Sequence, residues 1–216
     1  KLEAAQLFKM ASEKGDTKSM VALGCMHKEG DGIPVNKKEA LRYFKMGMVK
    51  GSTKAMDHYA VMLFDGDCIQ ANKKEAVRLF KKAADSNVET AMCHYANKLR
   101  LGDGTEKNIN EAVRYYKKAC EVECIEAMFE YAEMLEKGDG IPKNSDEAYS
   151  WYNRIIEKEK SPIKKEKNYK KIINQLKEKN SELERKNENM QLQLNEINMK
   201  ENQMKNKELI EKYREL

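Results

Sequence analysis

The chain has 216 residues, of which 36% are charged, 40% are hydrophobic and only 7% are aromatic. With just three prolines, this composition favours helices over a β-sandwich or barrel. The formal charge of +5 is too small to indicate a nucleic-acid-binding protein, so we expect no nucleic-acid partner. No run of about 18 apolar residues occurs, so we expect no transmembrane segment.

A unit of 36 residues repeats along most of the chain. Four successive units start with an Asn that is followed three residues later by Glu-Ala, and an earlier remnant lies at Glu3-Ala4. The four Asn residues are Asn36, Asn72, Asn108 and Asn144. A fixed period of this size without strand alternation is typical of a helical solenoid, in which stacked hairpins shelter each other's apolar faces.

The first helix of each unit is predicted to start at this Asn. The spacing to Glu39, Glu75, Glu111 and Glu147 indicates a capping box, in which the Asn side chain accepts a backbone N–H and the Glu reaches back to the cap. Along the helix, Ala40, Tyr43, Phe44 and Gly47 and their equivalents predict one buried stripe. Gly15, Gly51 and Asn87 can end these helices in a left-handed conformation, whereas Glu123 would be strained there.

The second helix carries small and large apolar residues at fixed places. In the unit that starts at Asn36, these residues are Ala55-Met56, Tyr59-Ala60 and Leu63. The column Met20, Met56, Met92 and Met128 could suggest a soft-metal site, but a spacing of about 10 Å between stacked helices favours core packing. The intervening Gly-Asp-Gly turns lack the Lys-Ser/Thr of a phosphate loop, so we interpret them as turns that need positive φ.

The motifs Ala-x₂-[Tyr/Leu/Trp]-[Phe/Tyr]-x₂-[Ala/Gly], Ala-Met-x₂-[Tyr/Leu]-[Ala/Gly] and Gly-Asp-Gly-Ile-Pro-x-Asn-x₂-Glu-Ala resemble the Sel-like repeat family, relatives of tetratricopeptide repeats. The resemblance covers residues 3 to about 157, ending in a fifth first helix with Trp151 and Tyr152. It implies an adaptor scaffold. A secreted bacterial branch carries a disulfide in each unit, a pattern that this chain lacks. We predict an all-α fold: a right-handed α-solenoid of two-helix repeats over residues 1–160, then a coiled-coil helix over 161–216.

The C-terminal segment is predicted to be a long helix. Ser161-Pro162 suits a helix start, and no Gly or Pro follows up to the end of the chain. Apolar residues recur every seventh position, which is typical of a coiled coil. The predicted seam consists of Ile173, Leu176, Asn180, Leu183, Asn187, Met190, Leu194 and Ile197.

Two Asn residues at successive a positions of this seam bear on its partner. A buried Asn is satisfied best by a matching Asn, which favours a parallel, in-register pair of strands. Our hypothesis is a parallel homodimer formed by the tail. A hetero-coiled coil and a lone charged helix are the alternatives.

A basic strip repeats on the first helices. Arg42, Arg78 and Arg114 occupy one position, and Lys45, Lys81 and Lys117 follow one turn later on the same face. The spacing favours a solvated, solubilising face, and the sharper alternative is a docking site for an acidic peptide or protein.

Candidate catalytic and metal-binding residues do not form a pattern. The chain has an odd number of cysteines, five, and their spacing does not recur from repeat to repeat. This indicates reduced thiols in an intracellular, cytoplasmic protein. Cys120 and Cys124 lack a second ligand pair. His58 and His94 are equivalent, but no Ser, Cys or carboxylate recurs beside them, so we interpret them as ordinary surface or groove histidines. We therefore predict no catalytic residue, no metal and no cofactor.

The predicted function is a non-enzymatic protein-protein interaction scaffold. It would bind its partner on the solenoid and self-associate through the tail. Two alternatives are the regulatory or targeting arm of a larger enzyme such as a protein kinase, and a structural component of a cytoskeletal or organellar assembly. Because Lys1 lies inside a repeat, we expect the chain to be a fragment of a longer protein.

Overall fold

The protein is helical throughout the part of the chain that the structure describes. The computed structural model describes residues 1–160 and 169–214, which contain helices and no strand. The helices are α1 (Leu2–Glu13), α2 (Thr17–Glu29), α3 (Lys37–Val49), α4 (Thr53–Asp65), α5 (Lys73–Asp85), α6 (Glu89–Leu101), α7 (Ile109–Glu121), α8 (Ile125–Lys137), α9 (Ser145–Lys160) and α10 (Tyr169–Arg214). The chain divides into two compact units, Lys1–Ile155 and Ile156–Leu216. The predicted all-α fold of successive two-helix repeats is confirmed.

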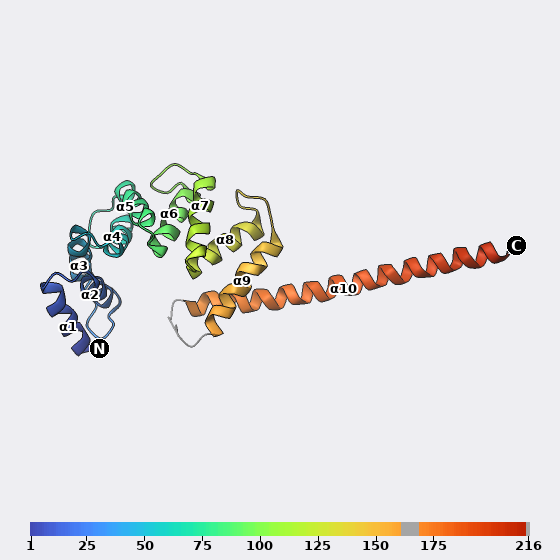
Figure 1. Ribbon diagram of the computed structural model, residues 1–216, viewed down its shortest axis with the longest axis horizontal. Coiled ribbons are helices and arrows are strands. Elements are labelled where there is room, and N and C mark those ends of the chain that lie inside the picture. The colour runs from blue at the N-terminus through green and yellow to red at the C-terminus, as the bar shows by residue number, and fades with distance from the viewer. Residues whose placement is uncertain (161–168, 215–216) are drawn as a thin grey trace. The chain divides into compact units, whose positions relative to one another are not determined.

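The helices of the first unit form a stack of hairpins. Helices α1 to α8 follow one another along a curved path (Figure 1). The two helices of a repeat pack together, as α3 does with α4, and the second helix of one repeat packs against the first helix of the next, as α4 does with α5. Second helices of consecutive repeats, such as α4 and α6, also contact each other. Helices α2 to α7 therefore each have a neighbour on both sides.

The predicted helix starts are confirmed at all four asparagines. The side-chain oxygen of each Asn accepts the backbone N–H of the Glu three residues later, which satisfies one of the unpaired donors in the first turn. The N···O distances are 3.1, 3.0, 3.0 and 3.1 Å for Asn36, Asn72, Asn108 and Asn144.

The other half of the predicted capping box is wrong. The backbone N–H of Asn72 donates to the carbonyl of Leu63, nine residues earlier, at 3.0 Å, so Glu75 has no free donor to reach. Glu75 instead pairs with Arg78, whose Nη2 donates to Oε1 at 2.6 Å. The same backbone bond joins Asn36 to His27, Asn108 to Leu99 and Asn144 to Leu135, each at 2.8 Å. This bond closes every loop between repeats.

The first helices of four repeats end at a left-handed residue. These residues are Gly15, Gly51, Asn87 and Glu123, with φ of 97°, 87°, 61° and 63°. Glu123 therefore takes the conformation that its side chain was expected to oppose, at a cost of about 1–2 kcal/mol. Its backbone N–H donates to the carbonyl of Cys120 at 2.9 Å, and its carboxylate lies 3.6 Å from the guanidinium of Arg154. These contacts offset the strain.

The core lies at the interfaces between helices. The predicted stripes are buried: Phe44, Phe80 and Tyr116 on the first helices expose no more than 1% of their surface. The methionine column is also core, as the packing argument predicts, and Met20, Met56, Met92 and Met128 are all buried.

One face of α1 departs from this pattern. Leu7 and Phe8 are 66% and 36% exposed, whereas the equivalent Tyr43 and Phe44 on α3 are buried. No helix in the described part of the chain covers Leu7 in the way that α2 covers α3. The burial of these positions therefore depends on the preceding second helix.

Gly24 marks the closest approach at the first repeat interface. A Cβ atom on Gly24 would lie 2.3 Å from Cε1 of Phe44. The equivalent residues in the next three repeats are alanines, Ala60, Ala96 and Ala132, and all are fully buried. The ring of Phe44 thus takes the space that a methyl group fills in the other repeats.

We expect Gly24→Ala to lower the free energy of unfolding by about 1–3 kcal/mol, because the methyl group overpacks the contact with Phe44. Helix propensity alone predicts the opposite sign, a gain of about 1 kcal/mol. Urea denaturation of both proteins measures the difference. Adding Phe44→Leu, which makes room for the methyl group, should reduce the effect of Gly24→Ala, and a stabilised single variant would contradict the packing argument.

Candidate functional site

The arginines of the predicted basic strip lie on exposed faces of α3, α5 and α7. The side chains of Arg42, Arg78 and Arg114 are 52, 66 and 57% exposed. Each guanidinium pairs with a carboxylate three residues earlier in its own helix. The pairs are Arg42 with Glu39 at 2.8 Å, Arg78 with Glu75 at 2.6 Å and Arg114 with Glu111 at 3.6 Å.

Two lysines of the strip, Lys81 and Lys117, lie against tyrosines of the second helices. Lys81 Nζ is 5.9 Å from the ring centroid of Tyr95 and 3.9 Å from the carboxylate of Glu111 in the next repeat. Lys117 Nζ is 5.6 Å from the ring centroid of Tyr131. Both contacts are compatible with a weak cation–π attraction at an exposed site.

Lys45 lies in a shallow hollow on α3. This hollow is lined by Arg42, Lys45, Met46, Val49 and Lys50. It combines three cationic side chains with apolar surface, and Val49 is among the exposed large hydrophobic residues. All six predicted strip residues thus lie on first helices, with three Glu carboxylates between them, so the strip keeps a net positive charge.

A polar cluster connects the second helices of repeats two and three. Asp57 on α4 is 1% exposed. Its Oδ2 accepts a hydrogen bond from Thr90 Oγ1 at 2.6 Å, and its Oδ1 lies 2.9 Å from Nδ1 of His94, both on α6. A buried carboxylate needs such partners, because an unpaired one would be very costly.

Asp57 and His94 shift each other's pKa. Burial opposes ionisation of Asp57, but the hydrogen bond and charge of His94 outweigh it and lower the pKa of Asp57. Burial likewise opposes protonation of His94, but Asp57 outweighs it and raises the pKa of His94. Glu126 raises this pKa further, while Lys98 opposes it. The pair is therefore held as an ion pair in mildly acidic solution.

His58 occupies the equivalent position one repeat earlier and behaves differently. Its ring stacks on Phe44 with centroids 4.8 Å apart, and Nε2 lies 3.7 Å from Sγ of Cys25. Burial lowers the pKa of His58, and the nearby Asp57 does not compensate for it. Two histidines at one repeat position thus differ in charge because only one of them contacts a carboxylate.

Arg100 joins the third repeat to the fourth. Its Nη2 donates to Glu130 on α8 at 3.1 Å, and its Nη1 donates to Asp139 in the following loop at 3.0 Å. Only 21% of the Arg100 side chain is exposed, so water screens these pairs less than it screens those of the strip.

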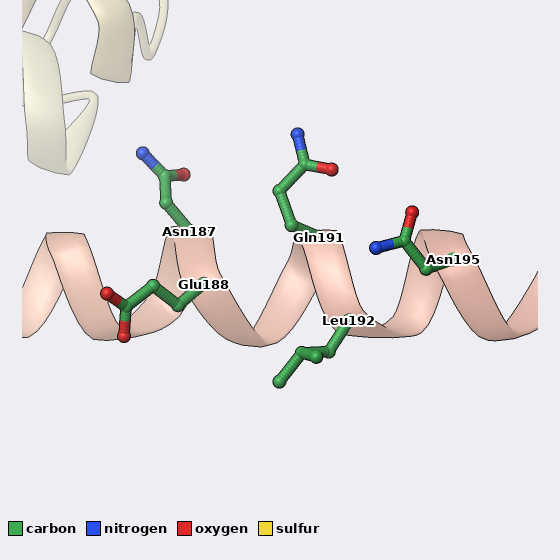
Figure 2. Close-up of a pocket in the computed structure, with 5 residues that line it drawn as sticks. All are labelled: Asn187, Glu188, Gln191, Leu192 and Asn195. Atoms are coloured by element: carbon green, nitrogen blue, oxygen red, sulfur yellow. The ribbon is translucent and has the colours of Figure 1, made fainter.

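Helix α10 carries the predicted coiled-coil seam. Met190, Leu194 and Ile197 are 60, 51 and 54% exposed along one stripe, and Asn187 lies on the same stripe. Figure 2 shows Asn187 and Gln191 pointing to one side of the helix and Leu192 pointing to the opposite side. The side chains of the other predicted seam residues, Ile173, Leu176, Asn180 and Leu183, lie outside the described residues, as does the predicted helix start at Ser161-Pro162.

Metal-binding and membrane-spanning features were also sought. Among the residues that the structure describes, no group of three or more His, Cys, Asp or Glu side chains could hold a metal ion. No helix in the described ranges is long and apolar enough to cross a membrane. All five cysteines are free thiols.

The repeats match a known family over most of the chain. The Sel1 repeat pattern matches residues 1–16, 17–47, 53–88, 90–122 and 125–159. The chain belongs to the Sel1 repeat family. Proteins of this family are generally repeat scaffolds for protein interactions rather than catalysts. No protein with a curated description matches the chain.

Solved structures of Sel1 repeat proteins share the fold. The chain is similar to a Sel1 repeat protein from Oxalobacter formigenes, with a TM-score of 0.61 and 29% identity over 72% of this chain and 64% of that one. It is also similar to a protective antigen present in uropathogenic Escherichia coli strains, with a TM-score of 0.59 and 22% identity over 73% and 34%. An immunity protein from Pseudomonas aeruginosa gives a TM-score of 0.54 and 19% identity over 70% and 56%. The last two show the fold alone.

The contacts between Sel1 repeats include side chains whose role the sequence did not reveal. His58 and His94, interpreted as ordinary surface or groove histidines, lie partly buried between consecutive repeats. The sequence did contain one signal of this contact. Asp57 is acidic, whereas the equivalent residue in the next Sel1 repeat is the buried Cys93. An acid at a buried repeat position requires a partner on the neighbouring second helix.

We expect the Asp57–His94 pair to make stability depend on pH. The raised pKa of His94 gives a stabilisation that is complete below about pH 6.5 and is lost as the pH rises through the folded-state pKa. The lowered pKa of Asp57 gives a second stabilisation of the folded state, which is lost only as the pH falls below about 4. Wild type should therefore exceed His94→Gln in urea midpoint by more at pH 5.5 than at pH 8.5.

The matched control is His58→Gln, since His58 contacts no carboxylate of its own and its pKa is lowered. Its urea midpoint should not fall further behind wild type at the lower pH. NMR titration of the two imidazoles should place His94 above His58. Equal losses for His94→Gln at both pH values would contradict the ion pair.

Proposed function

We propose that the protein is a non-enzymatic scaffold that binds an acidic protein or peptide on the basic strip and dimerises through α10. The observation that carries the proposal is the stripe of Met190, Leu194 and Ile197, each more than half exposed at heptad positions of one helix. A continuous apolar stripe of this spacing is buried when a second helix packs along it. Linking two solenoids in this way would give avidity for a partner with repeated sites.

Asn187 supports a second copy of this chain as the occupant of the stripe. It lies between heptad layers whose apolar residues would pair with themselves in a parallel dimer. A buried Asn amide in that arrangement meets its own counterpart, which fixes register at some cost in stability. A partner helix with an apolar residue opposite Asn187 would leave the amide unpaired.

Charged residues also flank the stripe. Lys186 at a g position is paired within its helix to Glu182, with Nζ and Oε1 2.9 Å apart. In a parallel dimer, Lys200 at g of one chain would face Lys205 at e of the other.

The basic strip supports the second part of the proposal. Its arginines are exposed, repeat at one place in three successive helices, and keep donors beyond those used by their Glu partners. An extended acidic chain running along the stack could contact each repeat in turn. The internal Glu pairs reduce the attraction without reversing it, because bases outnumber acids on the strip.

We expect the protein to be a dimer at micromolar concentration by sedimentation equilibrium. Leu194→Glu with Ile197→Glu should make it monomeric, because four carboxylates cannot be buried in one seam. The matched control is Leu192→Glu with Met199→Glu, which places the same charges at exposed positions off the stripe and should leave the dimer intact. A monomeric wild-type protein would remove this part of the proposal.

We expect Arg78→Ala with Arg114→Ala to weaken binding of a fluorescein-labelled polyglutamate peptide by about three- to tenfold at low salt. The difference should shrink as salt is raised, because the attraction is between exposed charges. Lys54→Ala with Lys107→Ala removes the same charge from exposed places off the strip and serves as the control. An equal loss in the control would indicate that net charge, rather than the strip, attracts the peptide.

A further inference from the structure

We propose that the shallow hollow on α3 binds one large apolar side chain of the acidic partner, so that the partner segment carries an apolar anchor residue beside its acidic residues. This inference rests on the proposed docking of an acidic segment on the basic strip and names what that segment must contain. The hollow has a volume of about 320 Å³ and is lined by Arg42, Lys45, Met46, Val49 and Lys50. This volume lies at the lower end for binding pockets and suits a single side chain.

The surface of the hollow is partly apolar. Val49 is 76% exposed, and Met46 is partly buried because it packs against the core of the first repeats. Arg42 Nη1 lies 3.7 Å from Sδ of Met46, so the Arg42 side chain extends along α3 beside the thioether. Exposed apolar atoms that are surrounded by cationic side chains favour a ligand with both apolar and acidic groups.

The next two repeats carry charged residues where α3 is apolar. The equivalents of Met46 and Val49 are Lys82 and Asp85 in α5, and Lys118 and Glu121 in α7. A segment that lies along the strip therefore meets apolar surface at α3 and charged side chains at the same positions of α5 and α7. Its anchor residue belongs at one end, against α3, with the acidic residues running towards α5 and α7.

Two cations of the hollow have charges that no carboxylate offsets. Neither Lys45 nor Lys50 forms an ion pair with a carboxylate in the part of the chain that the structure describes. Lys81, the equivalent of Lys45, lies 3.9 Å from Glu111 of the next repeat. The corresponding carboxylate for Lys45 is Glu75, which pairs instead with an arginine of its own helix at 2.6 Å. Both lysines can therefore attract acidic residues next to the anchor.

Fluorescence anisotropy with labelled glutamate-rich peptides tests this inference. One peptide carries a Leu at an end of the glutamate run, in versions for either end, and its control carries Ser there. In one version the Leu peptide should bind wild type about three- to tenfold more tightly than its Ser control, because part of the Leu side chain leaves water. Val49→Ser should reduce this preference to twofold or less. The matched control is Val122→Ser, which removes a 51% exposed valine outside the hollow and should keep the preference.

The outcomes separate the anchor from the strip. Equal binding of the Leu and Ser peptides to wild type, still weakened by Arg78→Ala with Arg114→Ala, would overturn the anchor and leave the strip as the docking site. Failure of both peptides to bind would overturn the anchor and the docking proposal together. A lower association state of Val49→Ser in sedimentation would mean that a second copy occupies the hollow, which would also overturn the anchor.

Photo-cross-linking locates the anchor directly. A benzophenone amino acid in place of the Leu should label the tryptic peptide of residues 46–50, which contains both Met46 and Val49. The unlabelled Leu peptide should compete with this labelling, and the Ser peptide should compete about three- to tenfold less well. Labelling confined to tryptic peptides of α5 or α7 would contradict an anchor site on α3.

Discussion

The structure depends on the burial of one face of each first helix by the second helix of the preceding repeat. Phe44, Phe80 and Tyr116 occupy the same place in three successive interfaces and are almost completely buried. A single hairpin has no second surface on which to bury this face, so folding of one repeat favours folding of the next. Leu7 and Phe8 on α1 show the consequence of leaving such a face uncovered.

Much of this architecture could be predicted because the period repeats every local signal. The Asn caps, the Ala and Met positions and the turn glycines each occur several times, so an error in one copy is corrected by the others. The Glu arm of the capping box could not be predicted, since the backbone bond that uses its donor joins residues nine apart and depends on the folded loop. Glu123 takes the left-handed φ that its propensity opposes, because the hydrogen bonds of the loop require it.

The surfaces were less predictable than the core. The positions of the strip arginines could be predicted from their spacing. Their pairing with Glu could not, because it depends on which other groups those carboxylates contact. Asp57 and His94 are 37 residues apart and belong to no motif, yet they make a buried contact between repeats. Such contacts differ from one interface to the next: the Asp57–His94 pair joins repeats two and three, and the Arg100 contacts join repeats three and four. The apolar part of the interface is shared, and the polar part distinguishes the copies.

The backbone bond that closes each loop has a mechanical consequence. Because the cap N–H of one repeat is held by the last turn of the repeat before it, the connecting loop cannot act as a hinge without breaking that bond. Bending of the stack must then come from small sliding movements of packed helices rather than from hinge rotation at the loops. A scaffold of this kind would hold bound partners at fixed spacing while yielding gradually under force.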